Sequence, residues 1–308
     1  MRIKSKVEPK AKMKVPDGSA FAIETAPHLP KLHQVCIVNG KRGAGKGVAV
    51  FGNLLRMYKE TGRLQRLILV SPTTHSNKRL LEEFDIQEED IFDDPDAPGI
   101  PQAIIKIVND ERDEYVRWRE LKRNYEKVMK QLEEGEMVND QMIMSYYNPE
   151  SNTFEVPEPK YKCYLEGRPP VIMCVFDDFI TSKVCSDPKL SQLVLKHRHQ
   201  GSLPEGGAIG ISLFFLIQSY KARNSIPPCI RNQATSAILF RSRDLAEKKT
   251  IADSFSGEID PETFIRVYDE ATKDSPHDFL FVDLHHKPNQ TQFRRNFDQY
   301  LIIEDGVK

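Results

Sequence analysis

Short apolar runs, each closed by a polar or glycine-rich turn, divide most of this sequence into strand-length pieces. The run at residues 171–176, VIMCVF, is apolar at every position, as expected of a central strand that is covered on both faces. Similar β-forming runs are found at residues 34–39, 67–70, 209–217, 234–240, 279–284 and 300–303. The pattern therefore predicts a sheet of several strands.

Apolar residues at helical spacing alternate with these runs. The first such group follows residues 34–39 and would share one face of a helix: Val48, Phe51, Leu54, Leu55 and Tyr58. Further helices are predicted at about residues 76–84, from near Asp244, and at about residues 261–272. Alternating strands and helices predict an α/β fold with a central, mostly parallel sheet flanked by helices.

A highly charged stretch at about residues 100–147 interrupts this alternation. It follows an acidic loop at residues 85–101 and leads into residues 148–170, which contain five prolines and are expected to form a linker. The stretch is predicted to be a helical insertion with one narrow apolar stripe: Tyr115, Trp118, Leu121, Tyr125, Val128 and Leu132. Either the insertion is a solvated helix, or it is a protruding helical pair that docks a neighbouring subunit or a partner.

The length of 308 residues is compatible with one large α/β domain. Residues 1–33 are rich in Lys and Pro without a sustained period, so an irregular basic arm is expected there. Residues 34–303 are then the domain itself, and residues 304–308 are a short tail.

Composition narrows the class of protein only slightly. The 44 Lys and Arg residues nearly balance the 45 Asp and Glu residues, and a net charge of −1 neither supports nor excludes a nucleic acid partner. The five cysteines show no metal-binding spacing and are expected to be small buried residues. No apolar run reaches the roughly 18 residues of a membrane span, so a soluble, intracellular protein is expected.

A glycine-rich loop follows the first strand and opens the first helix. Its sequence matches the phosphate-binding pattern G-x-x-x-x-G-K in the context which that pattern requires: Gly40, Lys41, Arg42, Gly43, Ala44, Gly45, Lys46 and Gly47. Backbone N–H groups and the helix N-terminus would hold the phosphates, and Lys46 would reach the outer ones. The pattern predicts a P-loop NTPase that binds ATP and Mg²⁺. Gly47 departs from it, because Ser or Thr usually ligates magnesium at this position.

Two acids end the central strand at residues 171–176. Carboxylates at the end of a buried strand are costly unless they serve a ligand. Asp177 is predicted to contact Mg²⁺ through its water shell, and Asp178 to orient the attacking water. Gln218 follows another strand and, in a parallel sheet, would emerge at the same edge, within reach of the γ-phosphate or the water. The alternatives are two surface acids and a polar strand end without a role.

A basic cluster, Lys196 to His199, follows the acids at some distance. Arg198 within it and Arg231 further along are candidates for an arginine finger. Such an arginine is supplied in trans, by one subunit to the active site of its neighbour, and neutralises charge there. His197 and His199 do not predict a metal site, because no further ligand lies near them in the sequence.

Taken in order, these motifs resemble the poxvirus-type genome-packaging ATPases of large double-stranded DNA viruses, a branch of the FtsK/HerA superfamily. The resemblance covers most of residues 34–303 and is carried by IVNGKRGAGKG, LVSPTTHSNK, VIMCVFDDF, KHRH, ISLFFLIQSY, IPPCIRNQATSAILFRS and FRRNF. It implies that Lys46 binds phosphate, Asp177 the metal and Asp178 the catalytic water, and that Gln218 is the polar sensor. Arg198 and Arg231 match arginines of these stretches. Gly47 and the long insertion depart from the family pattern.

The resemblance also implies partners and a setting. Subunits would form a homo-oligomeric ring around double-stranded DNA, hydrolyse ATP and drive the DNA into a preformed capsid through a capsid or portal-vertex protein. The expected location is the virion or the host-cell cytoplasm, and no membrane span is expected. Two alternatives remain: a cellular or plasmid-borne DNA-pumping ATPase of the same superfamily, and a nucleotide-binding module with weak or no turnover, which Gly47 favours.

Overall fold

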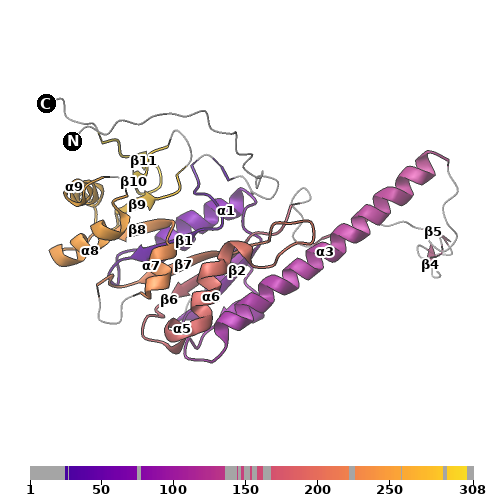
Figure 1. The fold of residues 1–308 in the computed structure, drawn as a ribbon, viewed down its shortest axis with the longest axis horizontal. Coiled ribbons are helices and arrows are strands. Elements are labelled where there is room, and N and C mark those ends of the chain that lie inside the picture. Colours follow the sequence, from indigo (N-terminus) through magenta and orange to yellow (C-terminus); the bar gives the residue numbers. More distant parts are fainter. Residues whose placement is uncertain are drawn as a thin grey trace, which may run out of the picture.

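The strands form one central sheet in a computed structural model of the chain (Figure 1). The structure describes residues 25–26, 28–74, 78–135, 144, 147–148, 153–154, 158–161, 168–221, 226–257, 259–286 and 290–303. Most of the expected N-terminal arm and the whole expected tail at residues 304–308 lie outside the described residues.

The described strands form a nine-stranded sheet in the order β11-β10-β9-β8-β1-β7-β6-β2-β3. From β8 to β3 all neighbours are parallel, whereas β9, β10 and β11 add an antiparallel edge. The prediction of a mostly parallel sheet is confirmed. The strands of the sheet are β1 (Val35–Asn39), β2 (Arg66–Val70), β3 (Ile91–Phe92), β6 (Ile172–Asp177), β7 (Ser212–Ile217), β8 (Ser236–Phe240), β9 (Phe279–Asp283), β10 (Phe293–Arg295) and β11 (Gln299–Tyr300).

Two strand boundaries differ by three residues from those predicted. β7 begins at Ser212 and not at residue 209, because Gly210 has a φ of 69° and the backbone N–H groups of residues 209–211 bond to the preceding loop. The last run was predicted over residues 300–303, but β11 ends at Tyr300. The short strands β3 and β10 lack a clear apolar pattern and were not predicted.

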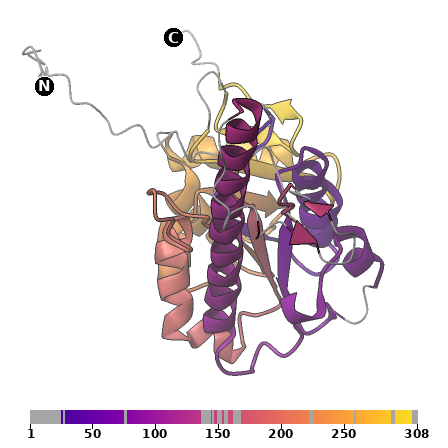
Figure 2. The same ribbon diagram turned by 90° about the vertical axis from the view of Figure 1, so that its right-hand side faces the viewer.

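Helices cover both faces of the sheet, as predicted. A π-helical segment (Val48–Leu55), α1 (Arg56–Glu60) and α2 (Lys78–Phe84) pack on one face. The other face is covered by α3 (Ile100–Glu133), α6 (Pro188–Lys196), α7 (Pro228–Gln233), α8 (Leu245–Phe255) and α9 (Pro261–Ala271). A hydrophobic core lies on each face of the sheet, and successive strand residues point into opposite cores: Ile37 into one and Val38 into the other. Figure 2 shows α6 and the helices that follow β1 on opposite sides of the sheet.

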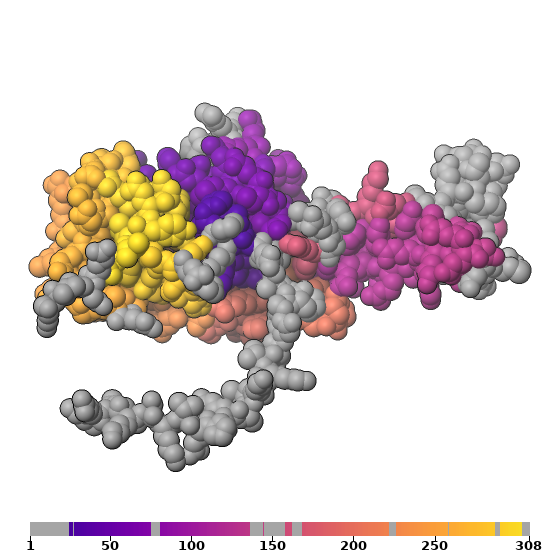
Figure 3. Space-filling model, turned by 90° about the horizontal axis from the view of Figure 1, so that it is seen from above, coloured from indigo at the N-terminus to yellow at the C-terminus, as the bar shows by residue number. Residues whose placement is uncertain are grey.

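The charged insertion contains one continuous helix, α3, 34 residues long. A helical pair was the alternative considered, and the described residues do not show one. The reason is visible in the sequence: no Gly or Pro interrupts residues 102–133. The apolar stripe is only partly buried, because Leu121 and Leu132 are 52% and 49% exposed, whereas Tyr115, Trp118 and Val128 are buried. Beyond the body, α3 projects as an arm (Figures 1 and 3).

A buried ionic cluster joins the base of α3 to the sheet. Arg66 of β2 bonds Asp90 through its Nε and Nη2 atoms at 2.8–3.0 Å and bonds Glu111 of α3 at 2.6 Å. The remaining described elements are short: α5 (Lys183–Ser186), 3₁₀ turns at Glu88–Asp90 and His197–His199, and a separate hairpin of β4 (Tyr147–Asn148) and β5 (Thr153–Phe154). Of the described helices, none combines the length and the apolar character of a membrane span.

Candidate functional site

Strand register brings the predicted residues to one edge of the sheet. β7 lies between β1 and β6, with Asn39 opposite Ile217 and Leu216 opposite Asp177. The three strands are parallel, so the residues after them emerge together. The Gly40 N–H donates to the Ile217 carbonyl at 3.1 Å, which fixes the start of the glycine-rich loop beside the end of β7.

Different physical constraints require glycine at different positions of the loop. A Cβ atom added to Gly40 would lie 2.9 Å from Phe240 Cδ2 and 3.0 Å from Phe240 Cβ, so the backbone there passes directly over that ring. Gly43 and Gly45 have φ angles of 79° and 105°, which side chains rarely adopt. Lys46 then donates from Nζ to the Gly40 carbonyl at 2.7 Å, across the loop. The loop is therefore curled, with Lys46 bonded back to its first residue.

The two acids occupy different positions in a tight turn. Asp177 is the last residue of β6, and Asp178 has a left-handed φ of 49°. That conformation lets the next residue, Phe179, turn back into the core, where its ring lies 5.6 Å from Phe176 and 5.4 Å from Phe215. Asp178 remains exposed at the sheet edge. Backbone strain of this kind is common at functional sites.

Gln218 contacts the second acid directly. Its Nε2 atom donates to Asp178 Oδ1 at 2.8 Å, so the amide holds the carboxylate in one orientation. This contact places Gln218 beside Asp178. Its contact with a phosphate or a water stays a prediction.

These groups line one cavity of about 550 Å³, which we call the loop cavity. It is lined by Lys41, Arg42, Gly43, Gly45, Lys46, Gly47, Val48, Thr73, Asp177, Asp178 and Gln218. Thr73 was not singled out in the sequence. It follows β2, whose Val70 pairs with Phe176, so its segment ends beside the acids. The signal was present in the run SPTT after a parallel strand.

Burial shifts the pKa values of two charged groups in the loop cavity. Burial, and secondly the charge of Asp178, raise the pKa of Asp177 to about 6, while Lys46 opposes the shift. Burial lowers the pKa of Lys46 from its usual value, against the pull of both carboxylates. A ligand that brings negative charge to Lys46 and a cation to Asp177 would relieve both penalties.

The donor set of the loop cavity fits a hard divalent cation such as Mg²⁺, because two carboxylates and the Thr73 hydroxyl offer oxygen ligands. In the described part of the chain, no three or more His, Cys, Asp or Glu residues form a metal cluster. The cation would therefore complete its shell with water and phosphate. Gly47 has helical angles, and no atom lies within 4 Å of an added Cβ, so space is not what excludes a hydroxyl there.

Neither candidate arginine lines the loop cavity. Arg198 lies in the 3₁₀ turn His197–His199, whose His197 carbonyl accepts from Ile211 N just before β7, at the opposite edge of the sheet. Arg231 lies in α7, before β8 begins. An arginine supplied in trans acts on a neighbour, so the role of both residues stays a prediction. His197 bonds the carbonyls of Val194 and His33 through its two ring nitrogens, which makes it a structural residue.

A second cavity, of about 780 Å³, adjoins the loop and shares Gly43, Gly45 and Val48 with the loop cavity. We call it the side pocket. Its other lining residues are Ala49, Asn53, Met57, His277, Asp278, Phe279, Asn296, Phe297 and Asp298. None of these was predicted as a site residue, because they come from three segments that only the fold brings together.

No protein-family model matches the chain, and no curated protein sequence matches it. Several solved structures are distantly similar. ATPases 2 and 3 of EssC from Geobacillus thermodenitrificans are 15% identical over 81% of this chain, with a TM-score of 0.44, and this chain spans 37% of that one.

Two further structures were solved with ATPγS. The genome packaging NTPase B204 from Sulfolobus turreted icosahedral virus 2 is 10% identical over 88% of this chain and 98% of its own, with a TM-score of 0.46. The pCW3 conjugation coupling protein TcpA is 15% identical over 86% of this chain and 61% of its own, with a TM-score of 0.42.

Proposed function

We propose that this chain is a P-loop ATPase that hydrolyses ATP with Mg²⁺ and uses the energy to translocate double-stranded DNA. The observation that carries the enzymatic part is the loop cavity, in which Lys46, Asp177 and Asp178 converge. A cation over a curled glycine-rich loop suits phosphates, and paired carboxylates suit a metal and a water.

The reaction is attack of water on the γ-phosphorus of ATP, while the bond from that phosphorus to the bridging oxygen breaks. ADP leaves and inorganic phosphate forms. Lys46 and the loop N–H groups hold the β- and γ-phosphates; Asp178, oriented by Gln218, aligns the water and passes its proton to the phosphate product. Asp177 and the Thr73 hydroxyl are the groups that would hold Mg²⁺, which neutralises charge on the phosphate oxygens when bound.

The motor part of the proposal is supported by the order of motifs along the sequence, which resembles the poxvirus-type genome-packaging ATPases. On this basis the chain forms a homo-oligomeric ring, with Arg198 or Arg231 reaching a neighbouring active site. It packages viral DNA into a preformed capsid, in the virion or the host-cell cytoplasm, through a capsid or portal-vertex protein. DNA contacts would be to backbone phosphates, so affinity would fall with salt.

Gly47 favours a second candidate function, a nucleotide-binding module with little turnover. A P-loop that lacks the magnesium-binding hydroxyl has one fewer oxygen ligand, unless Thr73 serves in its place. Both candidate functions place the nucleotide in the loop cavity, and they differ in how fast ATP is hydrolysed there.

The test is steady-state ATP hydrolysis with Mg²⁺, with and without double-stranded DNA. We expect DNA to stimulate the wild type, and Lys46→Ala and Asp178→Asn each to lower turnover by roughly a hundredfold or more. Asp253→Asn, an exposed acid on α8, is the matched control and should behave as the wild type. Tight ATP binding without hydrolysis would leave the module as the function; hydrolysis that DNA does not change would contradict the motor.

A further inference from the structure

The side pocket continues the loop cavity past the glycines that the two share. The π-helical segment and α1 provide one wall, through Val48, Asn53 and Met57. The other wall comes from the C-terminal strands: the turn before β9 and the turn at residues 296–298 between β10 and β11. In Figure 3 these yellow C-terminal segments lie against the indigo and violet part of the chain. A molecule held by its phosphates on the loop would extend into this space.

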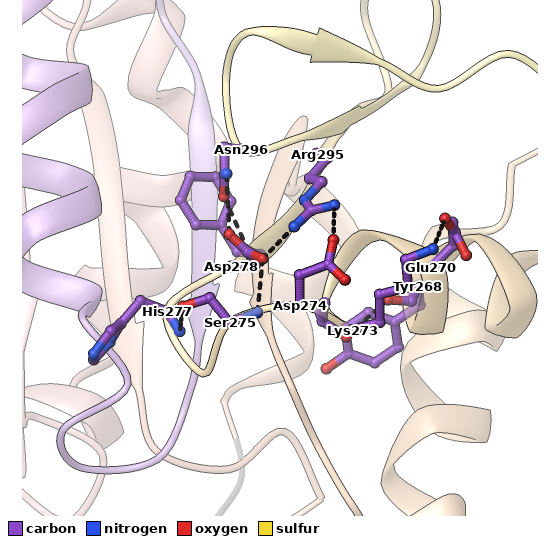
Figure 4. Close-up of polar contacts among 11 residues, drawn as sticks. Tyr268, Glu270, Lys273, Asp274, Ser275, His277, Asp278, Arg295 and Asn296 are labelled. Carbon is purple, nitrogen blue, oxygen red and sulfur yellow. Dashed lines mark hydrogen bonds and ion pairs between the residues drawn. The ribbon is translucent and has the colours of Figure 1, made fainter.

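A network of polar contacts fixes the two C-terminal turns to each other (Figure 4). The Asp278 carboxylate accepts from Arg295 Nη2 at 2.6 Å, from Ser275 N at 3.0 Å and from Asn296 Nδ2 at 3.2 Å. Asn296 has a left-handed φ of 55°, and its Oδ1 accepts from Phe279 N at 3.2 Å. Arg295 also bonds Asp274 at 2.5 Å. The wall is therefore preorganised before any ligand arrives.

Phe297 stands on this fixed turn and is held by other rings. It makes edge contacts with Phe279, at 4.9 Å between centroids, and with Phe281, at 5.3 Å. Phe297 remains half-buried and lines the side pocket together with Val48, which is 68% exposed. Exposed apolar side chains beside a rigid aromatic ring form a surface that a flat aromatic ligand can cover.

His277 links the side pocket to the loop. Its Nδ1 atom lies 3.0 Å from the Ala44 carbonyl. A carbonyl can only accept, so Nδ1 carries the proton, and Nε2 of the neutral ring is an acceptor. An acceptor next to the phosphate loop suits a sugar hydroxyl, which lies between the phosphates and the base of a nucleotide.

We propose that the side pocket binds the nucleoside part of the nucleotide, with Phe297 as the platform on which the base stacks and His277 beside the sugar. The proposal rests on the proposed function, because it requires that phosphates occupy the loop cavity. The C-terminal strands β9, β10 and β11 are then the part of this chain that distinguishes a nucleoside triphosphate from a bare triphosphate.

The experiment compares three ligands with the full chain in the presence of Mg²⁺: ATP, ribose 5-triphosphate and inorganic tripolyphosphate, each by calorimetry. For the wild type, we expect ATP to bind roughly tenfold more tightly than ribose 5-triphosphate, because only ATP has a base to stack. Phe297→Ala should lower the affinity for ATP by roughly tenfold and leave the affinity for tripolyphosphate within about twofold of the wild-type value.

Two further variants keep the result interpretable. Phe297→Leu retains most of the apolar volume beside Phe279 and Phe281 but removes the aromatic face, so it should lower the affinity for ATP and not the affinity for tripolyphosphate. It provides the test if Phe297→Ala fails to fold. Tyr300→Ala is the matched control, because Tyr300 belongs to the same hairpin, is 43% exposed and does not line the side pocket. ATP and tripolyphosphate should each bind this variant with the same affinity as the wild type.

The outcomes separate the two proposals. Tripolyphosphate that binds as tightly as ATP, or a Phe297 substitution that weakens both ligands equally or neither, overturns the nucleoside assignment while the loop cavity stands. If the wild type binds none of the three ligands, the proposed function fails, and the nucleoside assignment fails with it.

Discussion

The loop cavity and the side pocket adjoin the same loop but are built in different ways. The loop cavity is lined by residues at strand ends and by residues of one stretch, 41–48, and burial shifts the pKa values of charged groups in it, such as Asp177. The side pocket is made of residues 48–57, 277–279 and 296–298, and aromatic and aliphatic side chains such as Phe297 and Met57 contribute to its walls.

This difference has a physical origin. Phosphate recognition requires a particular backbone path, which restricts residue types at adjacent positions and leaves a motif in the sequence. Stacking of a base requires only an apolar face in the right place, which many residues can supply from any segment. The loop cavity should therefore respond to backbone and charge substitutions, and the side pocket to changes in apolar surface.

Gly40→Ala should have the largest effect on the loop cavity. The added methyl group would lie 2.9–3.1 Å from Phe240, close to the backbone end of that side chain, and the loop would have to move. We expect the free energy of unfolding to fall by about 1–3 kcal/mol, and both ATP and tripolyphosphate to bind at least tenfold more weakly. Chemical denaturation and calorimetry measure the two effects.

Gly47→Ala is the matched control, because it adds the same methyl group where no atom lies within 4 Å. It should bind both ligands normally and unfold no more easily than the wild type. If Gly40→Ala weakened ATP but spared tripolyphosphate, the division of labour between the two cavities would be wrong.

Asp177→Asn should change the pH dependence of stability. The pKa of Asp177 is raised to about 6 by burial and by Asp178, against an ordinary value of 3.8. The folded state therefore holds this proton more tightly than the unfolded chain, and stability is lost as the pH rises from about 4 through about 6. Asn removes that loss, so without metal or nucleotide the free energy of unfolding of the variant should exceed that of the wild type by about 3 kcal/mol near pH 8, since one pKa unit corresponds to about 1.4 kcal/mol.

The advantage of Asp177→Asn should shrink towards about pH 4, which denaturant unfolding across a pH series would show. Asp298→Asn provides the contrast between the two cavities, because Asp298 lines the side pocket and is exposed. It should change stability little at any pH. An equal gain from Asp177→Asn at every pH would mean that ionisation of the carboxylate is not the cause.

Sequence patterns predicted the fold to the extent that its signals are local. The central strands and the helices of residues 245–255 and 261–271 agree with their predicted positions, because apolar periodicity and capping acids such as Asp244 and Asp260 determine them locally. The short edge strands β3 and β10 were missed, since only neighbouring strands stabilise them. Val48 was predicted to share one helix face with Phe51, Leu54, Leu55 and Tyr58, but it is 68% exposed whereas those four are buried, because the segment that it begins is wound as a π-helix and not as an α-helix.

The site divides in the same way. The loop, Asp177, Asp178 and Gln218 were found from their position after parallel strands, and the structure places them around one cavity. Thr73 follows the same rule and could have been included. Phe297 and His277 could not, because nothing near them in the sequence indicates that the antiparallel edge returns to the loop. Only the pairing of β9 with β8 brings them there.

Gly47→Ser tests the one departure from the phosphate-loop pattern and should have the smallest effect. A side chain fits at this position, and the serine hydroxyl would provide an oxygen ligand that glycine lacks. One such contact contributes about 1 kcal/mol, so the Mg²⁺ concentration that supports half-maximal binding should fall roughly fivefold. Because the metal acts on phosphates, the Mg²⁺ requirement should fall equally for the binding of ATP and of tripolyphosphate. In Gly47→Ala it should not fall for either ligand. If Gly47→Ser left the Mg²⁺ requirement unchanged, a hydroxyl would already be in place, and Thr73→Val should then raise the requirement in the wild type. A gain confined to ATP would mean instead that residue 47 acts on the side pocket, which Gly43, Gly45 and Val48 line but Gly47 does not.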